Sequence, residues 1–260
     1  MADLLESIED GVAVLTLNRP EALNALSMDI RNGLLSAMER YADDSNVRCI
    51  VITGAGRAFS SGGDVKGMGE RAARGYESRA RGIQFSNSIP MAMRKHPKVI
   101  IAMVNGVAAG AGMSMSLACD LRIAGKSARF TTAFLKIGLS GDWGGTWTLT
   151  RLVGTAKARE LFLMPDMVGA DEALKLGIVN RVAEDADLRN TTMEIARRIA
   201  DMPQVAVAAV KRNLFAAETG SFADCLDHEA YNQARCSQTE DHREAVAAFK
   251  EKRKPVFKGM

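Results

Sequence analysis

The stretch from Val104 to Ala124, "VNGVAAGAGMSMSLACDLRIA", decides the fold, because it joins the end of one strand to the start of another through a glycine-rich turn and a short helix. The preceding residues 98–104, "KVIIAMV", form a continuous apolar run. Such a run is typical of a strand buried on both faces of a parallel sheet. "MSMSLACD" predicts the helix and "LRIAG" (121–125) the next strand, so the stretch indicates an α/β protein built from strand–turn–helix units.

The same order of elements appears on both sides of this stretch. Residues 12–17 and the apolar run 48–53 predict strands, and Ser27 is placed to cap a helix that runs to about Ala42. Further on, residues 146–154 and 156–163 predict helices, and 177–182 predict a late strand. From about Leu188 the pattern is helical to the end. We therefore expect a core domain over 1–190 that carries the functional site, and a helical region over 191–260.

Composition limits the class of protein. The chain has 260 residues, of which 47% are hydrophobic and 25% charged, and its formal net charge of +3 is too small to indicate nucleic-acid binding. No apolar run approaches the roughly 20 residues of a membrane span, and the first residues lack the pattern of a secretory leader. These features predict a cytoplasmic protein without a membrane partner.

Cysteine and histidine usage speaks against a metal site. The four cysteines form no CxxC pair and are expected to be reduced thiols. The three histidines form no ligand cluster, and His96 is interpreted as a structural loop residue.

Two glycine-rich turns, Gly54–Gly63 and Gly106–Gly112, each follow an apolar strand and could carry chemistry. Glycine allows backbone N–H groups to approach a ligand closely, and a helix that begins near Gly110 adds unpaired N–H groups. Two such turns that converge would supply two donors for one oxyanion. A dinucleotide-binding turn fits poorly, because Phe59 stands where its third glycine would be. A nucleophile elbow at Ser114 lacks the final glycine and a histidine partner.

Several motifs occur together in one order: "LNRPEALNALS" (17–27), "FSSGGDVKGM" (59–68), the stretch 104–124, "GLSGDWGGTWTLTRLVG" (138–154) and "TEDHREAVAAFKEKRKPVF" (239–257). With them the chain resembles the crotonase, or enoyl-CoA hydratase/isomerase, superfamily over nearly its whole length. The resemblance implies an α/β fold, a spiral of β-β-α repeats with a helical C-terminal region that serves oligomerisation and covers coenzyme A. It also implies assembly as a homotrimer or homohexamer.

The resemblance implies an acyl-CoA thioester as substrate, so that coenzyme A enters as part of the substrate and no separate cofactor is expected. By position, the backbone N–H groups of Gly63 and Ala111 form the oxyanion hole, and Ala111 stands where the family commonly has glycine. The remaining residues implied to bind substrate or coenzyme A, beside Gly63 itself, are Ser61, Asp64, Val65, Lys66, Phe134, Trp143, Phe249 and Lys252. For Lys252, a solvated helix end is an equal alternative.

Two departures from the family pattern bear on the reaction. Hydratases of the family carry two glutamates that activate water, and the matching positions here are Ser114 and Phe134. The resemblance therefore speaks against a simple hydratase. Asp142, in "IGLSGDWGGT" (137–146), matches a carboxylate that isomerase branches of the superfamily use instead, and that a dehalogenase branch uses as a nucleophile.

We interpret Asp142 as a general acid/base that shuttles a proton, with a pKa raised by Phe134, Trp143 and, as a further candidate, Trp147. The alternative is that Asp142 only caps the helix that begins near Gly144. At the level of function three hypotheses remain. They are a double-bond or ring isomerase, another crotonase-type enzyme such as a hydratase, thioester hydrolase or C–C lyase, and a non-catalytic acyl-CoA-binding protein.

Overall fold

The apolar runs of the sequence lie side by side in one large sheet. The computed structural model describes residues 2–64 and 75–259. Within these residues a six-stranded sheet has the order β1-β2-β3-β5-β7-β10, with β1 antiparallel to β2 and the other neighbours parallel. Its strands are β1 (Leu4–Glu9), β2 (Val12–Leu17), β3 (Cys49–Gly54), β5 (Val99–Val104), β7 (Leu121–Gly125) and β10 (Arg181–Ala183).

Shorter strands form a second sheet, of four strands in the described residues, with the order β4-β6-β8-β9. They are β4 (Ala58–Ser60), β6 (Val107–Ala109), β8 (Arg129–Thr131) and β9 (Val168–Gly169). Each turn of the chain thus adds one strand to the large sheet and the next strand to the small one: β3 then β4, β5 then β6, β7 then β8. This is the predicted spiral of β-β-α repeats.

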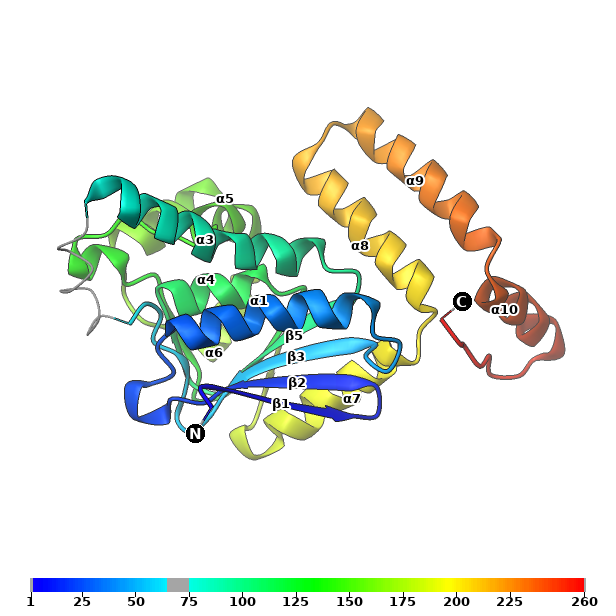
Figure 1. Cartoon of the computed structure of the whole chain (residues 1–260), viewed down its shortest axis with the longest axis horizontal. Coiled ribbons are helices and arrows are strands. Elements are labelled where there is room, and N and C mark those ends of the chain that lie inside the picture. Colours follow the sequence, from blue (N-terminus) through cyan, green and yellow to red (C-terminus); the bar gives the residue numbers. More distant parts are fainter. Residues whose placement is uncertain (1, 65–74, 260) are drawn as a thin grey trace.

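The helices complete the repeats and cover both faces of the large sheet (Figure 1). They are α1 (Met28–Asp43), α3 (Tyr76–Lys95), α4 (Ala111–Ala118), α5 (Gly145–Leu163), α6 (Ala170–Lys175), α7 (Leu188–Ala200), α8 (Gln204–Thr219), α9 (Phe222–Ser237) and α10 (Glu240–Glu251), with 3-10 turns η1 (Pro20–Ala22), η2 (Phe134–Ile137) and η3 (Asp185–Asp187). Ser27 caps α1 as expected, since its hydroxyl accepts the N–H of Ile30 at 3.2 Å.

Side-chain alternation along the central strands builds two hydrophobic layers. On β3, Ile50 and Ile52 belong to the larger cluster, which includes residues of α1, α3 and α4, whereas Cys49 and Val51 belong to a second cluster with residues of α7. Successive strand residues point to opposite faces of the sheet. Because helices cover both faces, successive residues of a central strand must all be apolar.

The C-terminal helices α8, α9 and α10 form an arm that projects from this core (Figure 1). The end of the chain returns to the core. Arg48 donates to the carbonyls of Phe257 and Lys258, and the buried Asp241 carboxylate accepts the N–H groups of Lys258 and Gly259 at 2.7 and 2.8 Å. The arm is therefore fixed at both of its ends.

The α/β fold with a helical C-terminal region is confirmed, with local differences. The late strand is only Arg181–Ala183. The two helices expected over 146–163 are confirmed: they meet at a kink at Gly154, whose backbone is non-helical (φ 76°), and together make up α5. The division at residue 190 stays a prediction: it falls within α7, which packs on the large sheet. None of the helices in the described part of the chain is long and apolar enough to cross a membrane.

Candidate active site

The two glycine-rich turns converge at the ends of β4 and β6. Gly62 has a φ of +91°, and a Cβ at that position would lie 2.6 Å from the Ala109 oxygen and 3.0 Å from the Ala111 nitrogen. Only glycine permits this approach. The backbone on either side of Gly63 is thereby held directly against the start of α4.

Both expected donor amides are free to serve a ligand. Ala111 is the first residue of α4, so its N–H has no acceptor within the helix. Gly63 pairs with Leu26 in a parallel bridge in which the Leu26 N–H donates to the Gly62 oxygen at 2.8 Å. In such a bridge Leu26 bonds to the neighbours of its partner, so the N–H of Gly63 itself points to the other side. The two amides and the positive end of the α4 dipole can therefore serve one oxyanion.

Phe134 connects the oxyanion turn to the turn that carries Asp142. A Cβ on Gly110 would lie 3.7 Å from the Phe134 ring, and a Cβ on Gly141 would lie 3.8 Å from it. The ring is 7% exposed and stacks on Phe162 with centroids 6.5 Å apart. Phe134 thus holds two backbone segments together with an apolar surface, at the position where hydratases of the family place a glutamate.

The turn around Asp142 has an unusual backbone. Three of its residues have a positive φ: Gly141 (118°), Trp143 (56°) and Gly144 (69°). Of these three, Trp143 is the one with a side chain. A left-handed conformation costs a residue with a Cβ about 1–2 kcal/mol. Two hydrogen bonds hold it: the Trp143 N–H donates to Asn87 Oδ1 at 3.0 Å, and the Gly145 N–H donates to the Asp142 oxygen at 3.1 Å.

The Asp142 carboxylate is buried and incompletely paired. Its Oδ1 atom has no hydrogen-bond donor among the residues that the structure describes. Burial raises the pKa of Asp142 above its ordinary value, and the positive charge of Arg31 on α1 opposes this rise. The side chain does not cap α5, whose N-cap is Gly144 and has no side-chain cap, so the capping alternative is wrong. A buried carboxylate oxygen without a donor is available to take a proton from a ligand.

Ser114 lies on α4 as a buried, small residue, one turn after Ala111. Its hydroxyl packs against Gly145, where a Cβ would lie 2.3 Å from Ser114 Oγ. Neither Ser114 nor Phe134 can act as a carboxylate. Asp64, which directly follows Gly63, is paired with Arg19, so Asp142 is the acid that we take as the candidate base.

The expected coenzyme A contacts are only partly brought to this site. Ser61 follows β4, and its hydroxyl donates to the Ala22 oxygen at 3.3 Å. Asp64 forms an ion pair with Arg19 at 2.9 Å. Val65 and Lys66 lie outside the described residues.

Phe249 and Lys252 lie on the arm, on α10 and at its C-terminal cap. Phe249 is 85% exposed, and Figure 1 shows α10 at the far end of the arm, well separated from α4. A single chain therefore does not bring these two residues to Gly63 and Ala111, and their binding role stays a prediction.

The two tryptophans occupy different surroundings. The Trp143 side chain is 1% exposed within the larger hydrophobic cluster, so its contact with substrate also stays a prediction. The guanidinium groups of Arg94 and Arg151 lie over the Trp147 ring, 4.5 and 3.6 Å from its centroid. Trp147 lines a small cavity together with Trp143 and Gly144, and its effect on Asp142 stays a prediction.

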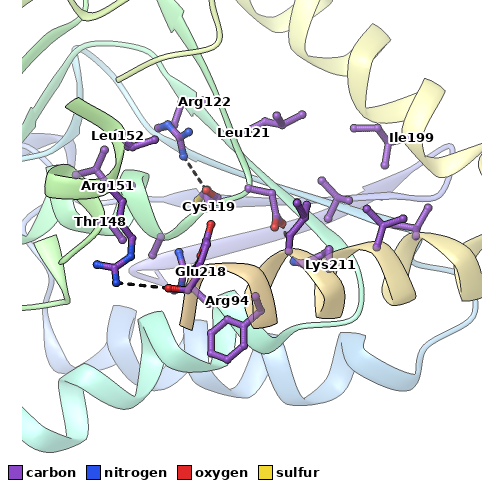
Figure 2. Close-up of a pocket in the computed structure, with 18 of the residues that line it drawn as sticks. Arg94, Cys119, Leu121, Arg122, Thr148, Arg151, Leu152, Ile199, Lys211 and Glu218 are labelled. Carbon is purple, nitrogen blue, oxygen red and sulfur yellow. Dashed lines mark hydrogen bonds and ion pairs between the residues drawn. The ribbon is translucent and has the colours of Figure 1, made fainter. Parts of the chain in front are cut away.

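A cavity of about 570 Å³ is separate from this site. Figure 2 shows it between α8 and the junction of α4 with β7, with Cys119, Arg122 and Lys211 among its walls. Its charged groups already have partners in the chain: Lys211 pairs with Asp120 at 2.6 Å, and Arg122 donates to two backbone carbonyls. Neither Asp142 nor either oxyanion amide lines it.

The structure adds two residues that the sequence did not indicate. Asn87 and Arg31 act on the Asp142 turn from α3 and α1, more than fifty residues earlier in the chain. Both are ordinary polar positions of amphipathic helices, and no local pattern distinguishes them.

His96 is structural, as expected. It is buried, its Nε2 lies 3.1 Å from the Met38 oxygen, and burial lowers its pKa to about 4.

Known proteins share this architecture over its whole length. Residues 7–260 match the family described as enoyl-CoA hydratase/isomerase. The chain is 36% identical over 260 residues to the 1,2-epoxyphenylacetyl-CoA isomerase of Escherichia coli (strain K12), covering 100% of this chain and 99% of the relative. It is 38% identical over 247 residues to the short-chain-enoyl-CoA hydratase of Clostridium acetobutylicum, covering 95% and 94%.

Among solved structures, an enoyl-CoA hydratase from Polaromonas sp. JS666 has a TM-score of 0.94 at 31% identity, covering 98% of this chain and 99% of that one. The chain belongs to the enoyl-CoA hydratase/isomerase family of the crotonase superfamily. It is an enzyme of this family, in which acyl-CoA is the implied substrate.

Proposed function

We propose that the protein is an acyl-CoA isomerase that moves a double bond, or rearranges a ring, with Asp142 as its general acid/base. The observation that carries this proposal is the buried Asp142 Oδ1 without a donor, on a turn packed through Phe134 against the oxyanion turn. No second carboxylate stands at Ser114 or Phe134 to activate water.

The proposed reaction needs one carboxylate and one oxyanion hole. The thioester oxygen accepts the N–H groups of Gly63 and Ala111. Asp142 then removes a proton from an acyl carbon, and the electrons of the broken C–H bond form a dienolate. Return of the same proton from Asp142 to another carbon restores the thioester carbonyl and leaves the double bond shifted. General base catalysis contributes about 10²–10⁴ in rate, and each oxyanion donor about 10²–10³.

The relatives support isomerisation and also keep an alternative open. The Escherichia coli relative is named as an isomerase of an epoxide thioester, whereas the Clostridium relative is named as a hydratase. Hydration, or other crotonase chemistry, is therefore the second candidate, and a non-catalytic acyl-CoA-binding protein is the third. We further propose that coenzyme A enters only with the substrate and that the protein is a homotrimer or homohexamer, which analytical ultracentrifugation would test.

The test is to incubate wild type, Asp142→Asn and the exposed control Asp201→Asn with 2-enoyl-, 3-enoyl- and ring-epoxide phenylacetyl-CoA thioesters. We expect isomerisation of at least one substrate, a loss of about 10²–10⁴ in kcat for Asp142→Asn, and no loss for the control. Full activity of Asp142→Asn would contradict the mechanism. Rapid hydration of crotonyl-CoA would support the second candidate, and tight binding without turnover the third.

A further inference from the structure

The turn that carries Asp142 is attached to α3 by one side chain. Asn87 Oδ1 accepts the N–H of Trp143, the residue directly after Asp142, at 3.0 Å. Trp143 is the residue of this turn that has a Cβ and a positive φ, and its side chain is buried. A strained backbone conformation persists only where several surrounding contacts hold it in place. Here one of these contacts is the hydrogen bond from the Trp143 N–H to an acceptor on a different element.

The rest of the turn is held by packing and by one hydrogen bond within the turn, from the Gly145 N–H to the Asp142 oxygen at 3.1 Å. Gly141 lies against Phe134 and Phe162, and Gly145 lies against Ser114, in each case through close apolar or van der Waals contact. The packing contacts limit where the turn sits. The peptide between Asp142 and Trp143 is held at both of its polar atoms, because its oxygen accepts the Gly145 N–H within the turn and its N–H donates to Asn87. Asn87 is the partner of this peptide that comes from another element, and it fixes the direction of the N–H.

We propose that Asn87 is a positioning residue for the Asp142 turn: its side-chain oxygen holds the peptide between Asp142 and Trp143 and so directs the Asp142 carboxylate toward the oxyanion turns. This inference rests on the proposed function of Asp142 as the acid/base. Asn87 itself touches the backbone of the turn and not the reacting atoms.

The charged groups near Asp142 determine how a substitution at Asn87 should affect the pKa of Asp142. Among the described residues, Arg31 on α1 is the charged group that acts on Asp142, and its Nη1 donates to Ser86, the neighbour of Asn87 on α3, at 3.1 Å. The elements packed around the turn contribute the uncharged Ser86 and Asn87 from α3 and Ser114 from α4. Arg94 of α3 lines a cavity together with Asn87 and Trp143, and its charge is paired with Glu218. A carboxylate at position 87 would therefore add a negative charge next to Asp142.

The experiment compares Asn87→Ala, Asn87→Asp and the control Gln84→Ala, an exposed position one turn earlier on α3. For Asn87→Ala we expect kcat to fall by about 10²-fold, the cost typical of a small misplacement of a catalytic group, with little change in KM. The acid limb of its pH–rate profile should move to lower pH, because the released carboxylate becomes hydrated. Asn87→Asp keeps an acceptor for the Trp143 N–H, so it should recover most of kcat while its acid limb moves to higher pH. Gln84→Ala should match wild type.

A second readout needs no turnover. The chain contains two tryptophans, so the Trp147→Phe protein reports on Trp143 alone. We expect its fluorescence to titrate with the neighbouring Asp142 carboxylate, and the midpoint to shift downward in Asn87→Ala and upward in Asn87→Asp.

The outcomes separate the two proposals. If Asp142→Asn retains full activity, the proposed function fails, and the fluorescence midpoints alone decide the role of Asn87. If Asp142→Asn is inactive but Asn87→Ala keeps the wild-type kcat and acid limb, the positioning role is overturned and the proposed function stands. A lower melting temperature with an unchanged acid limb would show a merely structural role and would also overturn it. Should Asn87→Ala not fold, Asn87→Asp still decides by its kcat above the acid limb: a kcat near that of wild type supports the positioning role, and a large loss despite the retained acceptor overturns it.

Discussion

Ser114 and Gly145 pack so closely that neither position can be enlarged alone: a Cβ on Gly145 would lie 2.3 Å from Ser114 Oγ and 3.2 Å from Ser114 Cβ. Position 114 is where hydratases of the family are expected to hold a glutamate. In this chain the space for a long side chain there is occupied by the first turn of α5, which follows directly after Asp142. The loss of a glutamate at one position and the placement of an aspartate on the adjoining turn are therefore sterically linked.

The first prediction concerns this contact. Gly145→Ala should destabilise the protein by about 1–3 kcal/mol, the usual cost of overpacking, and should lower kcat because it displaces the Asp142 turn. In the Ser114→Ala background the nearest atom would be a Cβ at 3.2 Å, so most of the loss should disappear. Chemical denaturation of the four proteins of this double-mutant cycle measures the coupling. Additive effects would show that the turn avoids Ser114 in another way.

The second prediction tests the Ala111 amide. Ala111 is the first residue of α4, where proline is well tolerated because the missing N–H has no helical partner. Ala111→Pro should therefore leave the fold intact, as judged by circular dichroism, while kcat falls by about 10²–10³. Ala111→Gly keeps the N–H and restores the residue common in the family, so it should retain activity. Equal activity of both variants would remove Ala111 from the oxyanion hole.

The third prediction concerns pH. Asp142 must be ionised to accept a proton, so activity should be lost as pH falls through its pKa, which burial holds above the ordinary value of 3.8. Arg31 lowers this pKa, so Arg31→Met should move the acid limb to higher pH. Ser86→Ala is the matched control, because it removes the hydrogen bond of Arg31 to Ser86 and leaves the charge. An acid limb that stays in place in Arg31→Met would mean that another group titrates there.

The fourth prediction concerns stability. Because burial raises the pKa of Asp142 in the folded state, the folded protein binds the proton more tightly than the unfolded chain. This contribution to stability is present below pH 3.8 and is lost as pH rises through the folded-state pKa. Asp142→Asn should therefore have a higher melting temperature than wild type at pH 7, and this advantage should shrink as the pH is lowered. A lower melting temperature at pH 7 would show that the ionised carboxylate is stabilised by partners.

The main strands and the Asp142 turn could be predicted from the sequence because the patterns that indicate them lie within a few consecutive residues. Residues 49–52 and 99–104 are apolar at every position, as expected of strands covered on both faces, and Asp142 is the one acid in its turn. The short strands β4, β6, β8 and β9 have two or three residues each, too few to show a period.

The residues that hold the Asp142 turn in place could not be predicted from the sequence. The sequence predicts that Trp143 binds substrate, which stays a prediction. The structure adds that Trp143 is buried and has a positive φ, and that its N–H has a partner on another element. That partner, Asn87, is exposed on a helix 56 positions away, so only the folded chain brings the two together.

The attachment of the chain's end to the core has a consequence for biosynthesis. Arg48, directly before β3, binds the carbonyls of residues 257 and 258, about 210 positions later. The strands of the large sheet leave the ribosome before the arm does. The far end of the arm can be attached only after residues 257 and 258 have also left the ribosome. Until then, the nascent protein carries helices α8 to α10 held at one end alone.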